Sequence, residues 1–396
     1  MRNPMIAAVT LSLTVACNQA GSEAPAAPPS ETTQKSAPKS AMETELDSIF
    51  ASFDDNDAPG CAVGIIHRGQ YALTRSYGMA NLEHNIPITA DSVFRIGSVS
   101  KQFTAAAIGL LAIQGRLDLD ADVHTYLPEL KEYGVPVTIR QMVHHVSGMG
   151  GYGKPNEFEV RDGKPFRFGN EDYWTIGEFY SAVTEQPLSL QPNEKYQYSN
   201  IAYFLLSQVV ERASGQTLRQ FAEDEMFGPL GMGATFFNDN VDGIVPNRAD
   251  GYRPLQGGSG YDIFMTNLDW VGDGGIYTSL NDFLLWDQAL ASGDMPGGDE
   301  LVTLMLTPNP ITQKTMDRPS FGDGAGYGFG LVIGSAEGEP VFGHNGAWVG
   351  FRAFYVRFPE RDASAVVFCN RADGLAEQKG DALMRLVQKH IPTAQQ

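Results

Sequence analysis

The most continuous hydrophobic stretch of the chain lies between Arg95 and Arg116, where Lys101 is the only charged residue. Residues 102–113 are mainly Ala, Leu, Ile, Phe and Gly, and they present no polar face at helical spacing. This pattern predicts a helix that is buried on all sides and ends before Gly115. A lysine at the start of such a helix is costly to bury, so its presence points to a chemical use.

Elsewhere the apolar positions follow two different periods. A period near 3.6, typical of amphipathic helices, predicts helices over residues 42–53, 138–145, 175–185, 201–214, 218–226, 283–291 and 376–390. A strand-like pattern predicts strands over residues 60–67, 71–78, 81–86, 340–344, 351–358 and 363–370. Strands near both ends with helices between them predict one sheet that the two terminal parts of the chain build together.

The first 41 residues lack this patterning. Arg2 followed by an apolar stretch up to residue 16 is typical of a secretory signal (residues 1–16), and it is too short to span a bilayer. Cys17 stands where a bacterial lipoprotein would be cleaved and lipidated; ordinary signal-peptidase cleavage and an incidental cysteine are the alternatives. Residues 17–41, rich in Ala, Pro, Ser, Glu and Thr, would form a flexible tether. We therefore expect an exported protein of the bacterial periplasm or outer membrane, with a lipid anchor as its one membrane contact.

The composition fits a large folded domain, because the chain has 396 residues of which 42% are hydrophobic and 19% charged. We assign that domain to residues 42–392. The net charge of −19 at pH 7 disfavours binding to nucleic acid, whose backbone is itself negative. The expected partner is a small molecule or a short peptide, and the sequence leaves the oligomeric state open.

Two cysteines and two histidines invite further interpretations. Cys61 and Cys369 lie in strand-like runs, where buried free thiols are favoured over a disulfide, although export would permit a bridge. His144 and His145 are adjacent, but no further His or Cys follows at metal-ligand spacing, so we expect no metal and no cofactor. Hydrogen bonds that brace a loop are the expected role of this pair. Residues 150–173, rich in Gly, charged and aromatic residues, fit a rim or lid over a site and a plain surface loop equally.

Ser98-Val99-Ser100-Lys101 opens the buried helix with the residue types of an activated nucleophile. A serine and a lysine three positions apart share one helix face, so the amine can reach the hydroxyl. Burial lowers the pKa of a lysine, and a neutral amine can take the serine proton. Backbone N–H groups at a helix N-terminus favour a developing oxyanion. The same spacing occurs at Ser36 and Lys39 in the proline-rich tail, so the context alone distinguishes Ser98.

Tyr198-Ser199-Asn200 precedes the predicted helix over residues 201–214. Near the nucleophile, the Tyr198 hydroxyl would relay a proton to a leaving group and the Asn200 amide would orient the substrate. A structural explanation, an N-cap with a packed tyrosine, accounts for the triplet as well.

His344-Asn345-Gly346 is expected to end one strand and begin a turn, with Ala347 following. Gly346 would let a ligand approach the backbone, and the Ala347 N–H would join the Ser98 N–H in an oxyanion hole. The structural explanation here is a hairpin turn with a hydrogen-bonded histidine.

These three motifs, in this order, resemble those of the serine β-lactamase and penicillin-binding-protein-like hydrolases, especially the branch of class C β-lactamases, D-aminopeptidases and family VIII esterases. The likeness runs from about residue 42 to residue 390, and no Gly-x-Ser-x-Gly elbow of the other common serine hydrolase fold is present. Four supporting stretches also look alike: Phe94-Arg95-Ile96-Gly97, residues 143–148, Pro229-Leu230-Gly231-Met232 and Gly274-Gly275-Ile276.

The resemblance implies an α/β (α+β) fold with a central antiparallel sheet flanked by helices and an all-helical subdomain. The sheet part would comprise about residues 42–95 and 325–392, and the helical part about residues 96–324. In that fold the strand near Cys61 runs beside the strand ending near Cys369, so the two sulfurs would face each other.

The resemblance also implies an acyl-enzyme hydrolase in which Ser98 is the nucleophile and Lys101 and Tyr198 share the proton transfer. Which of the two takes the first proton stays open, because they titrate as a coupled pair. The N–H groups of Ser98 and Ala347 would form the oxyanion hole. The implied substrate-binding residues are Asn200, His344, Asn345, Gly346 and Ala347.

His344 departs from the family, since true β-lactamases and transpeptidases usually carry lysine at this point of the motif. With a pKa near 6.5 it would be largely neutral at pH 7.5 and cationic at pH 5.5, so anionic substrates would bind better in acid. Exchange for lysine would then favour penicillins and peptides that end in D-Ala.

We therefore expect an exported serine hydrolase that cleaves a small amide or ester, either a D-amino-acid peptide or a carboxylic ester. A β-lactamase or D-Ala-D-Ala carboxypeptidase is the alternative. A non-catalytic binding or sensor module with the same fold is a further alternative, against which the complete set of Ser98, Lys101, Tyr198 and Asn200 counts.

Overall fold

The computed structural model describes residues 39–151, 159–160, 164–165, 173–374 and 377–394. The predicted secretory signal (residues 1–16), Cys17 and nearly all of the predicted tether (residues 17–41) lie outside the described residues. Most of the predicted rim or lid (residues 150–173) lies outside them as well.

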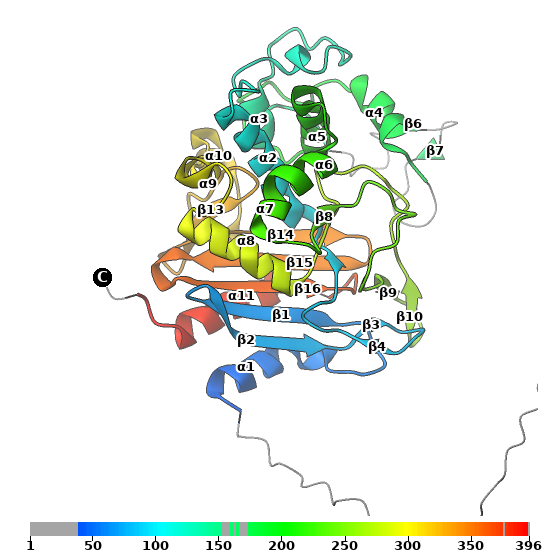
Figure 1. The fold of residues 1–396 in the computed structure, drawn as a ribbon, viewed down its shortest axis with the longest axis vertical. Helices are drawn as coiled ribbons and strands as arrows, with labels where there is room; N and C mark the ends of the chain where they lie inside the picture. Colours follow the sequence, from blue (N-terminus) through cyan, green and yellow to red (C-terminus); the bar gives the residue numbers. More distant parts are fainter. Residues whose placement is uncertain (1–38, 152–158, 161–163, 166–172, 375–376, 395–396) are drawn as a thin grey trace, which may run out of the picture. The chain divides into compact units, whose positions relative to one another are not determined.

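Within the described residues, seven strands form one antiparallel sheet in the order β12-β13-β14-β15-β16-β1-β2 (Figure 1). Strand β1 pairs with β16, so the N-terminal hairpin and the C-terminal meander share a sheet, as predicted. The strands are β1 (Cys61–His67), β2 (Gln70–Tyr77), β12 (Gly326–Tyr327), β13 (Val332–Ala336), β14 (Glu339–Trp348), β15 (Phe351–Phe358) and β16 (Ala363–Cys369).

Burial along the strands follows their place in the sheet. Central strand β1 is a near-continuous apolar run and is buried along almost its whole length, whereas edge strand β2 alternates between buried and exposed residues. Phe354 and Tyr355, neighbours in β15, face opposite sides: a Cβ on Gly380 would touch the Phe354 ring, and Tyr355 packs 4.9 Å from Phe283. The sheet therefore has helices on both faces.

Helices α1 and α11 cover one face of the sheet, α8 covers the other, and α2 to α6 gather beyond it (Figure 1). Most helices begin directly after a residue whose side chain caps them; Thr138, for example, forms a capping box at α3. The helices are α1 (Ala41–Phe50), α2 (Lys101–Ile113), α3 (Ile139–Val143), α4 (Ile176–Thr184), α5 (Asn200–Ser214), α6 (Leu218–Ala222), α7 (Gly228–Leu230), α8 (Leu280–Ser292), α9 (Gly298–Leu306), α10 (Pro310–Thr315) and α11 (Glu377–His390).

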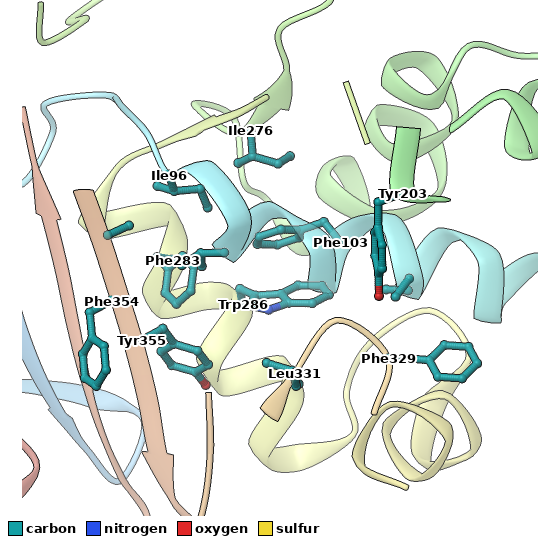
Figure 2. Close-up of a cluster of buried hydrophobic side chains, with 14 of the residues drawn as sticks. Ile96, Phe103, Tyr203, Ile276, Phe283, Trp286, Phe329, Leu331, Phe354 and Tyr355 are labelled. Atoms are coloured by element: carbon teal, nitrogen blue, oxygen red, sulfur yellow. The ribbon is translucent and has the colours of Figure 1, made fainter. Parts of the chain in front are cut away.

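Helix α2 lies in the core, as its lack of a polar face predicts, and residues 101–111 are all buried. Its polar Gln102 is satisfied there, because the side chain donates to the Val99 carbonyl at 3.0 Å and accepts from Trp286 at 2.7 Å. The rings of Phe103, Trp286 and Phe283 then connect α2 to α8, with Phe103 and Trp286 4.4 Å apart (Figure 2). This aromatic core fixes the start of α2 relative to the sheet.

One predicted strand and one predicted helix differ in the structure. The strand predicted over residues 81–86 is instead a small hairpin of β3 (Met79–Asn81) and β4 (Ile86–Pro87), because residues 82–85 form the turn between them. The helix predicted over residues 218–226 continues from α6 into a π-helical segment, Glu223–Phe227. The remaining short strands are β5 (Phe94–Arg95), β6 (Glu159–Val160), β7 (Lys164–Pro165), β8 (Phe236–Phe237), β9 (Tyr252–Pro254), β10 (Tyr261–Ile263) and β11 (Ile276–Thr278).

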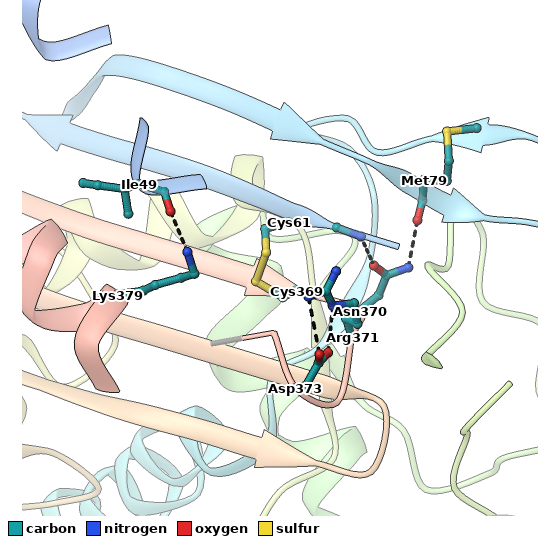
Figure 3. The surroundings of a disulfide bond; sticks show 9 residues. Ile49, Cys61, Met79, Cys369, Asn370, Arg371, Asp373 and Lys379 are labelled. Carbon is teal, nitrogen blue, oxygen red and sulfur yellow. Dashed lines mark hydrogen bonds and ion pairs between the residues drawn. A yellow bond between two sulfur atoms is a disulfide. The ribbon is translucent and has the colours of Figure 1, made fainter. Parts of the chain in front are cut away.

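Cys61 and Cys369 are joined by a disulfide (Figure 3). The residue pattern favoured free thiols, and that prediction is wrong. The two cysteines are direct partners in the β1–β16 register, as the family resemblance implied, whereas a pattern of separate strands cannot reveal this pairing. Asn370 completes this end of the sheet: its side chain accepts the Gly60 N–H at 2.8 Å and donates to the Met79 carbonyl at 3.0 Å (Figure 3).

Reduction of this disulfide is expected to lower the free energy of unfolding by about 2 to 5 kcal/mol, because the bridge closes a very long loop in the unfolded chain. Cys61→Ser and Cys369→Ser should each cost as much as the double variant, since either change removes the same bond. A non-reducing digest should yield the two cysteine peptides linked. Two free thiols in that digest would contradict the pairing.

Candidate active site

Ser98 sits in a short 3-10 turn, Gly97–Ser100, between β5 and α2, and it meets strand β14 there. Two glycines allow the approach: a Cβ on Gly97 would lie 2.7 Å from the Ala347 nitrogen, and one on Gly346 only 2.1 Å from the Ile96 carbonyl oxygen. Gly97 also has φ +52°, which favours glycine. Ser98 and Ala347 consequently line one cavity of about 380 Å³.

Lys101 is fully buried, and its ammonium is held by three oxygens. Nζ lies 2.7 Å from Asn200 Oδ1 and 3.5 Å from Ser98 Oγ, and it also donates to the backbone carbonyl of Asp273. The Tyr198 ring centroid lies 4.8 Å from Nζ. The structure thus brings together the side chains of four candidate residues from the first two motifs: Ser98, Lys101, Tyr198 and Asn200.

Burial lowers the pKa of Lys101 to about 7, although the charge of Asp273 opposes this shift. Burial raises the pKa of Asp273 to about 6, while Lys101 and Arg95 act in the other direction. The two groups titrate together. A substantial share of Lys101 is therefore a neutral amine near pH 7, within reach of the Ser98 hydroxyl.

Tyr198 lies between Lys101 and His145, with the two ring centroids of Tyr198 and His145 4.3 Å apart. Its hydroxyl oxygen is buried and makes no hydrogen bond of good geometry within the described residues. Burial raises the pKa of Tyr198, whereas the Ser98 hydroxyl and the charge of Arg318 lower it. Its phenol is thus protonated at neutral pH and lies beside the Ser98 hydroxyl.

The structural explanation of the second motif is confirmed, and it leaves room for the functional one. Ser199 is the N-cap of α5, since its Oγ accepts the Ala202 N–H at 3.0 Å, and it donates to the Gly150 carbonyl at 2.7 Å. Because Ser199 does the capping, the neighbouring Asn200 side chain remains available to Lys101 and to the cavity.

The third motif is not at a turn, contrary to the prediction. Strand β14 runs on to Trp348, Gly346 pairs with Ala353, and the hairpin lies beyond, at residues 349–350. Period-two alternation therefore decides the orientations: Asn345 and Ala347 are exposed, whereas His344 is buried.

His344 is neutral, which corrects the expected titration near pH 6.5. Its Nδ1–H donates to the Asn345 carbonyl at 2.5 Å, so Nε2 accepts from the Tyr327 hydroxyl at 3.0 Å. Burial lowers the pKa of His344 to about 3, and Lys101 and Arg318 add to the shift. His344 consequently cannot become a cation for anionic substrates at pH 5.5, and a lysine there would place a further charge in a buried site.

The neighbouring histidines brace loops, as expected. His144 Nδ1–H donates to the Tyr327 carbonyl at 2.8 Å, and His145 Nδ1 accepts the Ser199 N–H at 3.1 Å. Burial lowers the pKa of His144 to about 4 and holds that of His145 well below its usual value. No group of three or more His, Cys, Asp or Glu side chains suited to a metal occurs in the described part of the chain.

Because these histidines are buried in the neutral form, the protein should become less stable towards unfolding in acid. Between about pH 6.5 and 4, His144, His145 and His344 stay neutral when folded but bind protons when unfolded, so the free energy of unfolding falls as pH drops. Each contributes a slope of up to about 1.4 kcal/mol per pH unit. Urea unfolding at pH 7, 6 and 5 measures the slope, and His144→Asn should reduce it. An unchanged free energy from pH 7 to 5 would contradict the burial of neutral imidazoles.

Sequence reasoning missed two charged residues of the site. Asp273 provides the carbonyl that holds Lys101, and Arg318 lines a second cavity of about 240 Å³ together with Asn345 and Ala347. Asp273 had a signal, because it is the one charged residue in the apolar, glycine-rich stretch from Trp270 to Thr278. Arg318 follows no motif and is brought to the site by the fold alone.

None of the helices in the described ranges is both long and apolar enough to cross a membrane.

Comparison with known proteins assigns the chain to a family. The β-lactamase family model matches residues 46–389. The chain is 27% identical to a D-aminopeptidase of Gluconobacter oxydans (strain 621H) over 83% of this chain and 58% of that protein. It is 26% identical to penicillin-binding protein 4* of Bacillus subtilis (strain 168) over 83% of this chain and 72% of that protein.

A solved structure gives the same result for the fold. The octameric penicillin-binding protein homologue from Pyrococcus abyssi superposes with a TM-score of 0.74 at 25% identity, over 88% of this chain and 77% of that one. The chain spans about three fifths of the length of the D-aminopeptidases that it matches. Since the family model covers most of the chain, this protein belongs to the β-lactamase family.

Proposed function

We propose that the protein hydrolyses a small amide or ester through an acyl-enzyme on Ser98. The observation that carries this proposal is the fully buried Lys101, whose amine lies 3.5 Å from Ser98 Oγ with a pKa of about 7. A lysine in this state can act as a base at neutral pH.

In the proposed reaction, Ser98 Oγ attacks the carbonyl carbon while its proton passes to the neutral amine of Lys101, either directly or through the Tyr198 hydroxyl, which gives up its own proton as it takes the new one. The N–H groups of Ser98 and Ala347 would stabilise the oxyanion, since both residues line the same cavity. Collapse of the tetrahedral intermediate breaks the bond to the leaving group, which takes a proton through Tyr198. Water then attacks the ester to Ser98 and restores the free hydroxyl.

For the substrate we propose a D-amino-acid peptide or a carboxylic ester. Likeness to D-aminopeptidases supports the first, with Asn200 as the amide that orients the acyl part. Exposed Asn345 and the adjoining backbone of Gly346 would bind the substrate along β14. His344, buried against Tyr327, would support this strand rather than touch the substrate.

A β-lactamase or D-Ala-D-Ala carboxypeptidase activity is the second candidate, and Arg318 is the observation that favours it. His344 supplies no charge, but Arg318 lines a cavity with Asn345 and Ala347, where a guanidinium can bind a carboxylate. A D-Ala-D-Ala peptide should then be cleaved faster than its C-terminal amide. Equal rates would remove this candidate.

A fluorophosphonate followed by intact-mass and peptide analysis tests the proposed nucleophile. One adduct, on the Ser98 peptide, is expected. A panel of p-nitrophenyl esters, D-aminoacyl anilides, D-Ala-D-Ala peptides and nitrocefin then ranks the substrates. A protein that takes no adduct and turns over none of the panel would be the non-catalytic module instead.

We also propose export, with lipidation at Cys17 and residence in the periplasm or outer membrane. The sequence of residues 1–17 supports it, and the Cys61–Cys369 disulfide fits an oxidising compartment. Palmitate incorporation that persists in Cys17→Ala, or is absent from the full chain, would overturn the lipid anchor.

A further inference from the structure

Two cavities adjoin the candidate site: Ser98 lines the one of about 380 Å³, Arg318 lines the one of about 240 Å³, and the two meet at Ala347 and Arg352. Tyr198, the proposed donor to the leaving group, packs toward His344 at a centroid distance of 6.2 Å and is affected by the charge of Arg318. Arg318 lines the 240 Å³ cavity, so the leaving group faces that side. The 380 Å³ cavity, which contains Ser98 and Asn200, is consequently left for the acyl group.

The wall of this acyl-side cavity is apolar and aromatic. Phe264, Trp348, Val349 and Ala372 form most of it, while the polar lining residues are Ser98, Asn200, Asp273 and Arg352. Val349 is the informative member, because it has φ +24° at the β14–β15 hairpin, a region that a β-branched residue rarely enters. Glycine would relieve this strain, yet only a larger side chain gives the cavity an apolar wall here. Strained residues of this kind tend to cluster at functional sites.

Neighbouring groups hold the wall rigidly. The Arg95 guanidinium lies 5.2 Å from the Trp348 ring, and Arg352 donates to the carbonyls of Val349 at 3.3 Å and Phe351 at 2.7 Å. Phe264 is seated close to the same hairpin, since a Cβ on Gly350 would lie 2.4 Å from the Phe264 carbonyl oxygen. These contacts position the wall residues around the cavity.

We propose that this cavity selects substrates with an apolar acyl group, and that Val349 and Phe264 are the residues that set this specificity. The inference rests on the acyl-enzyme function proposed above. Apolar contact is nondirectional and scales with buried area, so the cavity should favour a longer alkyl or aryl acyl group over acetyl until it is full.

The test is an acyl series with one leaving group: p-nitrophenyl acetate, butyrate and hexanoate. For the full chain, kcat/KM should rise roughly fourfold per methylene from acetate to butyrate, the factor expected for burying one CH₂. Val349→Gly should lower the butyrate-to-acetate ratio at least threefold and leave the thermal midpoint equal or higher, because it relieves the strain. Phe264→Ala should lower the ratio as well.

Glu337→Gly is the matched control, since Glu337 also has a positive φ, +50°, but lies in the β13–β14 hairpin at the opposite end of β14. It should leave the ratio unchanged. A full chain that prefers acetate, or variants at both positions that keep its ratio, would overturn the inference. Ser98 labelling by an ethyl fluorophosphonate separates the two failures: with labelling intact and a flat series, only the acyl specificity is wrong.

Discussion

Ser98→Ala is expected to lower kcat/KM for p-nitrophenyl esters by on the order of 10⁴-fold or more, and to abolish the fluorophosphonate adduct. Without the hydroxyl no acyl-enzyme can form, and Lys101 has no proton to take. The fold should persist, because Ser98 Oγ contacts Lys101 only at 3.5 Å and, together with Tyr198, belongs to the cavity rather than to the core packing. Turnover assays, intact-mass analysis and circular dichroism measure the three effects.

Ser100→Ala is the matched control two residues away. Its Oγ accepts the Ile276 N–H at 3.1 Å in the core, so removing it leaves a buried donor unpaired. This variant should lose about 1 to 3 kcal/mol of stability and still take the adduct. A Ser98→Ala protein that acylates at another serine would show that the nucleophile has been misassigned.

The elements that sequence periodicity predicted well are those whose local pattern and tertiary environment agree. Helix α2 has no polar face and is buried on every side, and β1 reads as a buried strand because helices cover both faces of the sheet. The overall fold was predicted from the three motifs, because their order indicates the family. Local sequence patterns therefore sufficed where the local preference for helix or strand agrees with the packing that the fold imposes.

Prediction failed where the outcome depends on register or on distant groups. The Cys61–Cys369 bond requires direct pairing in β1 and β16, and β14 continues through His344 because β15 pairs with it as far as Trp348. Asp273 stands out in the sequence as a lone charge in an apolar stretch, but only the fold shows that its carbonyl accepts from Lys101. None of these is decided by a window of sequence.

The pKa of His344 illustrates the same limit in electrostatics. An exposed histidine at this position would have titrated near neutrality, and the expected pH-dependent preference for anions followed from that assumption. Burial against Tyr327 and the charges of Lys101 and Arg318 instead keep the imidazole neutral. Whether a motif residue carries charge is thus a property of the cavity around it, not of the motif.

Lys101→Met is expected to reduce kcat/KM by roughly 10²- to 10⁴-fold, the range for loss of a positioned base. Methionine keeps much of the side-chain volume, so the fold should persist, but it removes the donor to Asn200 Oδ1 and to the Asp273 carbonyl, and the free energy of unfolding should fall by about 1 to 3 kcal/mol. Labelling of Ser98 should slow by a similar factor. Full labelling rates in Lys101→Met would assign the proton transfer to Tyr198 instead.

The pH profile distinguishes a base from a merely structural lysine. The neutral amine is the active form, and burial lowers the pKa of Lys101 to about 7, so kcat/KM should rise with pH along a limb centred near 7. Asp273 opposes that lowering, which means that Asp273→Asn should move the limb to lower pH. Because the pair is coupled, the limb reports an apparent value shared by both groups. A limb that stays in place or moves to higher pH in Asp273→Asn would show that Lys101 does not control the proton transfer.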